Sequence, residues 1–320
     1  MLFNKVQEIF NKTVYTRAEE LPQIHLFSDK DFEGINKVPY TVKSSLGHDL
    51  KGYFYYYDNP KKGRLVVFDH GMFCGHLNYF REIETILSHG YLVFAYDHTG
   101  CMESGGEGTG GFAQSLRDLN EVITSLKTIE ALNGYDIYVV GHSWGGYATL
   151  NIPKFHPDIK KIVPISGFIS PREIIYQHLS GIARIFAKRI YNIEREKNPD
   201  YMEISALDTL AKCDTCALII HSPNDHMVKF KRHFLKLKKE LKDKKNIEFL
   251  VVEGADHNPT YTLEAICEKN IFHKKLKRAS RSGQFNTEKG CLEFKNSLDW
   301  WKITEQNQEV WDKIFEFLDK

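Results

Sequence analysis

The segment 138–146, Tyr-Val-Val-Gly-His-Ser-Trp-Gly-Gly, places a serine between two glycines at the end of an apolar run. Because β-branched residues precede the serine and the helix-compatible stretch 145–155 follows it, we expect a sharp turn from a strand into a helix. Such a turn strains the backbone, and Gly141 and Gly145 remove the Cβ atoms that would clash there. The turn would lift the Ser143 hydroxyl out of the sheet and place it at the N-terminus of the helix. The segment therefore predicts a strand–serine–helix elbow with Ser143 as a candidate nucleophile.

Along most of the chain, short apolar runs alternate with amphipathic helical patterns, which is typical of a largely parallel sheet covered by helices. The first two runs, 39–46 and 50–58, predict a hairpin that turns at Gly47-His48-Asp49. Six further runs predict strands buried on both faces: 65–69, 91–97, 136–142, 162–166, 217–221 and 247–253. Helices are predicted between them at 79–89, 112–130, 145–155 and 228–243. We therefore expect an α/β fold with a mostly parallel, eight-stranded sheet and helices on both faces.

The chain is expected to have four parts. An N-terminal helix and lead-in occupy residues 1–38, where apolar residues recur at helical spacing between polar ones. The first part of the core spans 39–168, and its second part spans 211–320 and includes an extended C-terminus. Within that second part, the polar and mostly basic stretch 274–295 predicts a surface loop or a helix extension before a closing helix near 307–318.

The fourth part, residues 169–210, falls between two predicted core strands and is too long for a simple crossover. Ser170 and Pro171 form a helix start, with serine as the N-cap and proline at the first helical position. Apolar residues then continue at helical spacing to Ile190, opposite basic side chains. A helix of this kind would act as a cap above the carboxyl ends of the strands. A basic amphipathic helix can also lie on a membrane surface, but a cap packed on its own domain is the preferred interpretation.

The charge balance and the hydropathy of the chain exclude some partners. With 43 basic and 42 acidic residues, the formal net charge of +1 gives no reason to expect a nucleic acid partner. No apolar run is long enough to span a bilayer, and the N-terminus lacks the unbroken apolar stretch of a signal peptide. We therefore expect a cytoplasmic protein without stable membrane insertion.

The six cysteines, in a chain without a secretory signal, favour reduced thiols. Cys213 and Cys216 have the spacing of a redox or zinc motif, but no second pair of cysteines or histidines complements them. They also lead directly into the apolar run 217–220, so half-buried thiols in a loop are the preferred interpretation. We expect no metal ion and no organic cofactor.

Serine is a weak nucleophile at neutral pH and needs a histidine base that a carboxylate orients. On a serine elbow of this kind the chain order is serine, then aspartate or glutamate, then histidine. Asp225 lies on the turn after the predicted strand 217–221, where the orienting acid is expected. His257 follows the last predicted strand and would reach over the sheet as the base. Ser143, Asp225 and His257 are therefore the predicted catalytic residues.

Two neighbouring residues are rivals for these roles, Asp256 as the acid and His226 as the base. Neighbouring residues in an extended segment point apart, which argues against Asp256 reaching the face that His257 uses. A turn aspartate or a solvated histidine is common by itself. Three such groups in the expected order, each just beyond the end of a strand, are not.

A tetrahedral intermediate needs two backbone N–H donors at its oxyanion. One is expected from Trp144, the residue after the nucleophile. The other is expected from the loop after strand 65–69, where Gly71 lets the backbone turn its amides inward and Met72 is the predicted donor. His70 in the same loop is interpreted as a hydrogen-bonding brace, with a role as a base as the alternative.

These motifs resemble those of α/β-hydrolases, in the branch that includes monoacylglycerol lipases, lysophospholipase-like esterases and serine aminopeptidases. The resemblance spans residues 40 to 265 and is carried by short segments: His70-Gly71-Met72, Asp97-His98-Thr99-Gly100, Ser104-Gly105-Gly106, the elbow at 141–146, Asn224-Asp225 and Asp256-His257. One departure is Met102, which replaces the second glycine of the family's Asp-x-x-Gly-x-Gly-x-Ser loop. That loop is structural in the family, so the departure leaves the predicted triad unaffected. The resemblance implies the α/β-hydrolase fold and serine hydrolase chemistry.

We expect an enzyme that cleaves a small-molecule carboxylic ester through an acyl-Ser143 intermediate. Apolar side chains are predicted to bind the substrate and to favour a hydrophobic acyl or aromatic group: Phe73, Phe168, Ile182 and Phe186. A peptidase or amidase on the same triad is the first alternative. A non-catalytic binding protein with a hydrolase fold is the second alternative. The presence of all three triad residues and of the elbow glycines argues against it.

Overall fold

The computed structural model of the protein describes residues 2–179 and 181–320, except for the side chains of Leu2 and Ile182. The predicted substrate-binding side chain of Ile182 therefore lies outside the described part of the structure. Among the described residues, no helix combines the length and the apolar composition that a membrane span requires.

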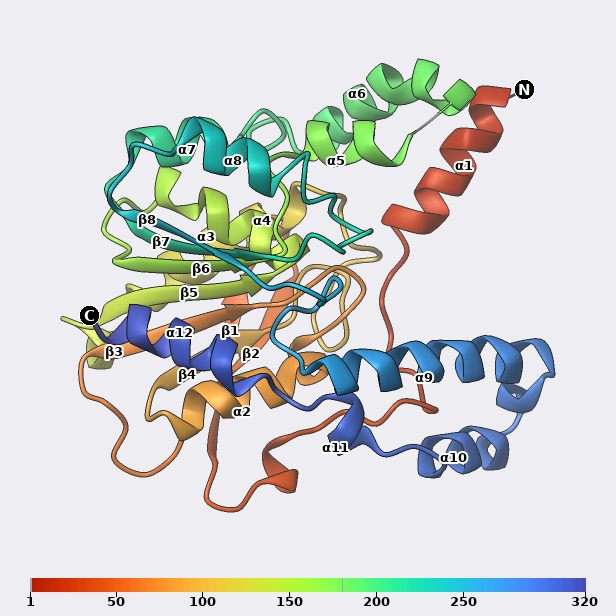
Figure 1. Cartoon of the computed structure of the whole chain (residues 1–320), viewed down its shortest axis with the longest axis horizontal. Coiled ribbons are helices and arrows are strands. Elements are labelled where there is room, and N and C mark those ends of the chain that lie inside the picture. Colours follow the sequence, from red (N-terminus) through yellow and green to blue (C-terminus); the bar gives the residue numbers. More distant parts are fainter. Residues whose placement is uncertain (1, 180) are drawn as a thin grey trace.

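An eight-stranded sheet forms the centre of the molecule, with the strand order β1-β2-β4-β3-β5-β6-β7-β8 (Figure 1). β1 and β2 form the predicted antiparallel hairpin, and β2 is also antiparallel to β4. The other neighbouring pairs are parallel. The strands are β1 (Asn36–Lys43), β2 (Asp49–Tyr56), β3 (Arg64–Asp69), β4 (Leu92–Tyr96), β5 (Asp136–His142), β6 (Lys161–Ile165), β7 (Cys216–His221) and β8 (Ile247–Val251). The predicted mostly parallel, eight-stranded sheet is confirmed.

Helices cover both faces of the sheet because the central strands are apolar on both sides. Along β3, Leu65 and Val67 pack into the core on one face, and Val66 and Phe68 pack into the core on the other. α3, α4, α7 and α8 cover the first face, and α2 and α12 cover the second (Figure 1). Their bounds are α2 (Phe80–Ser88), α3 (Gln114–Leu126), α4 (Trp144–Asn151), α7 (Ala206–Lys212), α8 (Phe234–Glu240) and α12 (Gln308–Asp319). Short 3-10 turns occur at η1 (Asp29–Asp31), η2 (His76–Tyr79), η3 (Glu130–Leu132), η4 (Ile152–Lys154) and η6 (Gln284–Asn286).

The basic stretch near the C-terminus is mostly helical. α9 (Leu263–Arg281) begins at an N-cap, because the Thr262 hydroxyl accepts a hydrogen bond from the Ala265 amide at 3.1 Å. α10 (Glu288–Asn296) and α11 (Trp300–Ile303) follow, and a small apolar cluster joins them to α9. Figure 1 shows α9 and α10 side by side, projecting beyond the sheet. The sequence predicted either a surface loop or a helix extension for residues 274–295, and the structure has the helix extension.

The insertion between β6 and β7 contains α5 (Pro171–His178), η5 (Gly181–Phe186) and α6 (Ala187–Lys197). α5 starts as predicted, with the Ser170 hydroxyl accepting a hydrogen bond from the Glu173 amide at 3.3 Å. The helix predicted to continue to Ile190 is instead broken, because Gly181 has a φ of 57°, a left-handed conformation that a right-handed helix does not accommodate.

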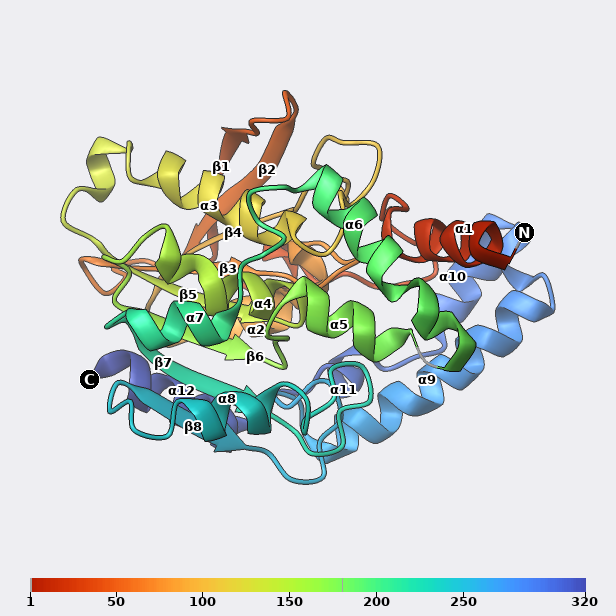
Figure 2. The ribbon, with the colours of Figure 1, turned by 90° about the horizontal axis from the view of Figure 1, so that it is seen from above.

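The N-terminal helix α1 (Leu2–Val14) packs against this insertion (Figure 2). The ring centroids of Phe3 and Phe186 lie 5.4 Å apart. The Arg189 guanidinium lies 3.7 Å from the centroid of the Phe3 ring, in a cation–π contact. The amphipathic N-terminal helix expected from the sequence therefore lies on the inserted helices.

Glu194 of α6 connects the insertion, the N-terminal segment and the core. Its fully buried carboxylate accepts a hydrogen bond from the Phe112 amide at 2.9 Å and another from the Tyr15 hydroxyl. The Phe112 carbonyl in turn accepts a hydrogen bond from the Trp144 indole at 2.8 Å. Burial raises the pKa of Glu194 to about 7, although the hydrogen bonds from Tyr15 and Phe112 oppose this rise. The junction between the three parts thus contains a carboxyl that titrates near neutral pH.

Glu194→Gln should stabilise the protein at alkaline pH more than at acid pH. The Glu194 carboxyl has a pKa of about 7 in the folded protein and about 4.3 in the unfolded chain. Its stabilising contribution is therefore complete below pH 4, where it is protonated in both states. That contribution is lost as the pH rises to 7. The glutamine oxygen can accept the hydrogen bond of the Phe112 amide, and the glutamine NH2 group can donate to the Tyr15 hydroxyl, so both contacts are kept without a buried charge. The variant should therefore be more stable than the wild type at pH 8. The difference between their free energies of unfolding should be up to about 3 kcal/mol larger at pH 8 than at pH 4.5.

Chemical denaturation at these two pH values measures this difference. Glu196→Gln, at an exposed position of the same helix, is the control and should show no such increase. A Glu194→Gln variant whose stability changes with pH as the wild type does would contradict the assignment of this titration to Glu194.

Candidate active site

Ser143 lies at the turn between β5 and α4 and has a strained backbone, with φ of 57° and ψ of −108°. Its amide donates to the Ile165 carbonyl at 2.8 Å, and its carbonyl accepts a hydrogen bond from the Tyr147 amide at 2.9 Å. A Cβ at Gly145 would lie 2.1 Å from the carbonyl oxygen of Asp69, a clash that only glycine avoids. The strand–serine–helix elbow expected from the sequence is therefore present.

Asp225 and His257 are hydrogen-bonded to each other. His257 Nδ1 lies 2.8 Å from Asp225 Oδ2, with the carboxylate fully buried and the imidazole 17% exposed. The other carboxylate oxygen accepts hydrogen bonds from the amides of Met227 and Val228, at 2.8 and 2.9 Å. Because His257 Nδ1 donates its proton to the carboxylate, its Nε2 is left as a proton acceptor. This is the arrangement that a general base requires.

A second histidine, His221, also faces Asp225. Its Nε2 lies 3.2 Å from Asp225 Oδ2 and donates to the Val228 carbonyl at 2.8 Å. Burial would raise the pKa of Asp225, but the hydrogen bonds from His221 and His257 hold it well below its usual range. Asp225 is therefore ionised at neutral pH. His221 is not among the residues predicted from the sequence, although its position at the end of a strand, four residues before the acid, was an available signal.

The two rival residues have other positions. Asp256 Oδ1 accepts hydrogen bonds from the Asn258 amide at 2.9 Å and from its side-chain Nδ2 at 3.2 Å. The Asp256 side chain thus stabilises the loop that carries His257. His226 is exposed. The structure pairs the His257 ring with Asp225, the acid that the sequence analysis preferred.

His142 joins the loop of the base to the elbow of the serine. It precedes Ser143, and its Nε2 donates to the His257 carbonyl at 2.7 Å. Its Nδ1 accepts a hydrogen bond from the Tyr79 hydroxyl at 2.8 Å. Burial lowers the pKa of His142 to about 3, so the ring is neutral at physiological pH. The ring centroids of His142 and His257 lie 4.7 Å apart, which places the base beside the elbow.

The loop after β3 lies against the elbow. A Cβ at Gly71 would lie 3.6 Å from the Cβ of Ser143. Within residues 2–179 and 181–320, neither the Met72 amide nor the Trp144 amide donates a hydrogen bond. Free amides next to a nucleophile are the donors that an oxyanion requires, and the first amides of a helix have no acceptor in the helix itself. Both predicted oxyanion donors are therefore available.

His70 is fully buried beneath this loop. Its Nδ1 donates to the Gly71 carbonyl at 2.8 Å, and its Nε2 accepts a hydrogen bond from the His98 amide at 2.9 Å. Burial lowers the pKa of His70 to about 3, so this ring is also neutral. Since both ring nitrogens are engaged, His70 has the contacts of a brace rather than those of a base.

The predicted substrate-binding residues differ in exposure. Phe73 lies in the loop after β3, has a left-handed φ of 61° and is 40% exposed. Phe168 is 3% exposed and stacks on Tyr147, with ring centroids 4.7 Å apart. Phe186 is half-buried against α1. Of these three side chains, Phe73 offers an exposed apolar surface beside the elbow, and substrate contact by any of them stays a prediction.

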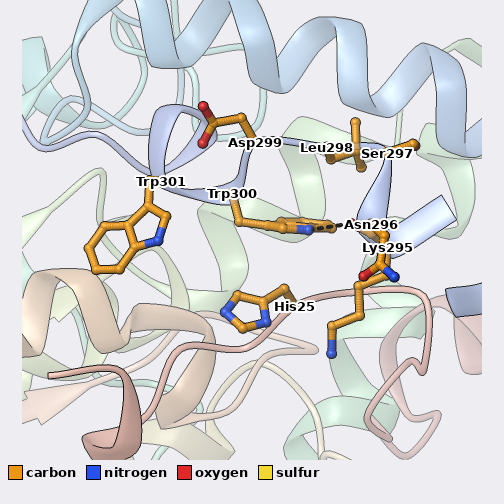
Figure 3. Close-up of a pocket in the computed structure, with 8 residues that line it drawn as sticks. All are labelled: His25, Lys295, Asn296, Ser297, Leu298, Asp299, Trp300 and Trp301. Atoms are coloured by element: carbon orange, nitrogen blue, oxygen red, sulfur yellow. Dashed lines mark hydrogen bonds between the residues drawn. The ribbon is translucent and has the colours of Figure 1, made fainter. Parts of the chain in front are cut away.

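A surface pocket of about 670 Å³ lies away from these groups, between the N-terminal lead-in and the segment that joins α10 to α11 (Figure 3). The Trp300 indole in its wall donates to the Lys295 carbonyl at 2.8 Å. Its lining residues are His25, Lys295, Asn296, Ser297, Leu298, Asp299, Trp300 and Trp301. None of the three predicted catalytic residues lines this pocket.

The cysteine pair considered as a metal or redox motif lies at the start of β7. Cys213 is buried and Cys216 is half-buried, and both are free thiols. In the part of the chain that the structure describes, no group of three or more His, Cys, Asp or Glu side chains is arranged to hold a metal ion.

Comparison with known families and sequences relates this chain to hydrolases. A family model described as serine aminopeptidase, S33, matches residues 60–224, just over half of the chain. The uncharacterized protein YqkD of Bacillus subtilis is 30% identical over 122 residues, which are 38% of this chain and 39% of that protein. The chain thus matches well under half the length of this curated relative.

Two esterases are among the solved structures with a similar fold. Esterase Pf2001 of Pyrococcus furiosus has a TM-score of 0.59 and 21% identity, over 82% of this chain and 95% of its own. Est1E of Butyrivibrio proteoclasticus, solved with bound ferulic acid, has a TM-score of 0.54 and 21% identity, over 68% of this chain and 90% of its own. At this identity both comparisons show a shared fold.

Asp225→Asn should lower the reactivity of Ser143 on the order of ten-thousand-fold, because the amide leaves the imidazole of His257 in the wrong tautomer. Covalent labelling of Ser143 by a fluorophosphonate, followed by mass spectrometry, measures the rate. Asp256→Asn is the matched control, since Asp256 precedes His257 in the chain but accepts its hydrogen bonds from Asn258. It should change the rate much less. The opposite ranking of the two variants would make Asp256 the orienting acid.

Proposed function

The chain belongs to the serine aminopeptidase S33 family and is a serine hydrolase with the α/β-hydrolase fold, and on this basis we propose that it cleaves carboxylic esters. The proposed substrates are small-molecule esters with a hydrophobic acyl or aromatic group. The observation that carries the proposal is the hydrogen bond of 2.8 Å between His257 and Asp225, beside the strained backbone of Ser143. A serine, an oriented imidazole and an ionised carboxylate are the groups that acyl transfer requires.

In the first half of the proposed reaction, Ser143 Oγ attacks the ester carbonyl carbon while His257 Nε2 accepts the hydroxyl proton. The carbonyl oxygen takes the electron pair of the C=O double bond and accepts hydrogen bonds from the amides of Met72 and Trp144. When the tetrahedral intermediate collapses, the C–O bond to the alcohol breaks. The alcohol leaves with the proton from His257, and the acyl group stays on Ser143.

In the second half, a water molecule attacks the acyl carbon and His257 accepts its proton. The same two amides stabilise the second oxyanion. The bond to Ser143 Oγ then breaks, the serine regains its proton from His257, and the carboxylic acid leaves. Asp225 orients His257 and balances the charge of the imidazolium in both halves.

Cleavage of an aminoacyl amide on the same triad is the second candidate, because the matching family is described as a serine aminopeptidase. An aminopeptidase must bind a cationic amino terminus, and a carboxylate is the group suited to that task. Two carboxylates of the insertion are already engaged. Glu173 binds Arg232 at 2.9 Å and Lys236 at 3.2 Å, and Glu194 accepts hydrogen bonds inside the core. These contacts remove both carboxylates as binding groups for an amino terminus.

Ser143→Ala tests the proposed reaction in parallel assays with p-nitrophenyl esters and amino-acid p-nitroanilides. The wild type should hydrolyse the esters, and the variant should lose about a million-fold in turnover because nucleophile and base act as a unit. Ester turnover above a few per cent of the wild-type rate in the variant would remove Ser143 from the mechanism. Anilide hydrolysis at a kcat/KM equal to that for esters would favour the aminopeptidase. Thermal unfolding of the variant is the control for its fold.

Phe73→Ala should weaken the use of esters with long or aromatic acyl groups and leave acetate esters nearly unchanged. Phe73 is 40% exposed and follows the predicted oxyanion donor Met72 in the loop after β3, so a bulky acyl group would bury it. One apolar contact is worth about 1–3 kcal/mol, so kcat/KM for the bulky esters should fall roughly ten- to hundredfold. Leu46→Ala is the control, since Leu46 is 50% exposed at the hairpin turn. Equal losses for acetate and bulky esters would mean that Phe73 shapes the loop and does not contact the acyl group.

A further inference from the structure

His98 lies fully buried just after β4, between two buried carboxylates. Its Nε2 lies 2.7 Å from Asp69 Oδ1, and its Nδ1 lies 3.2 Å from Asp118 Oδ2. Both ring nitrogens lie within ion-pair distance of carboxylate oxygens, and such partners favour the protonated, positively charged form of the ring. Burial alone would lower the pKa of His98, but the carboxylates of Asp69 and Asp118 raise it to about 9. The proposed reaction gives this buried ion cluster no role.

The backbone of His98 is connected to the first oxyanion donor through His70. The His98 amide donates to His70 Nε2 at 2.9 Å, which leaves the proton of the neutral His70 ring on Nδ1. That Nδ1 donates to the Gly71 carbonyl at 2.8 Å. The Gly71 carbonyl and the Met72 N–H belong to one planar trans peptide and point in opposite directions. The direction of the Met72 N–H therefore depends on His70, and the position of His70 depends on His98.

The ring of His98 contacts the residue that carries the second donor. The ring centroids of His98 and Trp144 lie 4.7 Å apart. The Trp144 indole donates to the Phe112 carbonyl at 2.8 Å, so this side chain is held from two sides. Since Trp144 is the first residue of α4, the contacts that hold its side chain also hold its amide at the elbow.

Asp118 of α3 holds the segment that carries His98. One of its oxygens accepts a hydrogen bond from the Thr99 amide at 2.8 Å. The other accepts hydrogen bonds from the Thr99 hydroxyl at 2.8 Å and from the Gln114 side chain at 2.7 Å. Within the core these bonds are shielded from water, so they restrain the position of His98 more than the same bonds at the surface would.

We propose that the buried ion cluster of Asp69, His98 and Asp118 positions the two oxyanion donors, with His98 as a positioning residue. The inference rests on the proposed ester hydrolysis, which supplies the oxyanion. His98 does not touch the reacting atoms. It holds the peptide of Met72 and the ring of Trp144 in directions that stabilise the transition state more than the bound substrate. Loss of the imidazolium should therefore lower kcat and leave KM nearly unchanged.

His98→Gln tests the inference, because it removes the imidazolium and keeps a polar side chain. We expect kcat for p-nitrophenyl esters to fall on the order of a hundredfold, as after the loss of one oxyanion donor, with KM within about threefold of the wild type. His156→Gln is the matched control. His156 is also buried and lies beyond the C-terminal end of α4, with its ring nitrogens 3.0 Å from Lys127 Nζ and 3.3 Å from the Asn120 carbonyl. This control should lose stability but keep the wild-type kcat.

Two results would overturn the inference in an active enzyme: a wild-type kcat in His98→Gln, or a loss of kcat equal to that of His156→Gln. If His98→Gln does not fold, Asp118→Asn takes its place, because it keeps the shape of the side chain and removes one charge. It should lose about tenfold in kcat at an unchanged KM, and a wild-type kcat would again count against the positioning role.

Ser143→Ala measured in parallel separates this inference from the proposed function. If the wild type hydrolyses no ester, or hydrolyses it as fast as Ser143→Ala, the proposed function fails. Crystal structures of the wild type and of His98→Gln then test the positioning without turnover. A rotated Gly71–Met72 peptide or a displaced Trp144 ring in the variant supports the inference, and an unchanged geometry of both would refute it.

Discussion

The close approach of α4 to the end of β3 is the contact on which the site depends. A Cβ at Gly145 would lie 2.1 Å from the Asp69 carbonyl oxygen, so the helix reaches this position only with glycine there. The approach places Ser143 beside the loop that starts at Asp69 and carries Met72. The same turn holds Ser143 at a φ of 57°, a conformation that costs about 1–3 kcal/mol. One backbone contact therefore brings together the nucleophile and the amides that would stabilise its oxyanion.

Four histidines lie near this contact, and they differ in protonation because their surroundings differ. Burial lowers the pKa of His70 and His142 to about 3, so both rings stay neutral and hold their neighbouring loops by hydrogen bonds. Carboxylates on both sides raise the pKa of buried His98 to about 9, so it stays charged and cannot accept a proton. His257 is the partly exposed one and shares its Nδ1 proton with Asp225. Burial and charge together thus leave His257 Nε2 as the imidazole nitrogen suited to take the serine proton.

Local patterns predicted much of the fold, and contacts between distant segments account for the rest. The strand before the serine runs from Asp136 to His142 as expected, because its apolar run and the glycine frame are local signals. The helix predicted at 228–243 is shorter, at Phe234–Glu240, and Met227 and Val228 before it lie in a turn where their amides donate to Asp225. The order of serine, acid and base was readable from the sequence, since each follows the end of a strand. The second partner of the acid, His221, was missed although it ends the strand four residues before Asp225, because the spacing alone does not show that the intervening turn brings the two side chains together.

Met102 departs from the family pattern, and the N-terminal segment, which lies outside the motifs, stabilises the loop that contains it. Met102 replaces a glycine and has a left-handed φ of 42°, which costs a residue with a side chain about 1–2 kcal/mol. Its amide donates to the Ala18 carbonyl at 2.9 Å. Next to it, the Arg17 guanidinium donates to the carbonyls of Ser104 and Gly106, both at 2.8 Å. Each of these bonds is worth about 1 kcal/mol, and more for a charged donor, so together they exceed the cost of the strained residue. The N-terminal segment, which lies before the matched residues 60–224, therefore stabilises a loop within them.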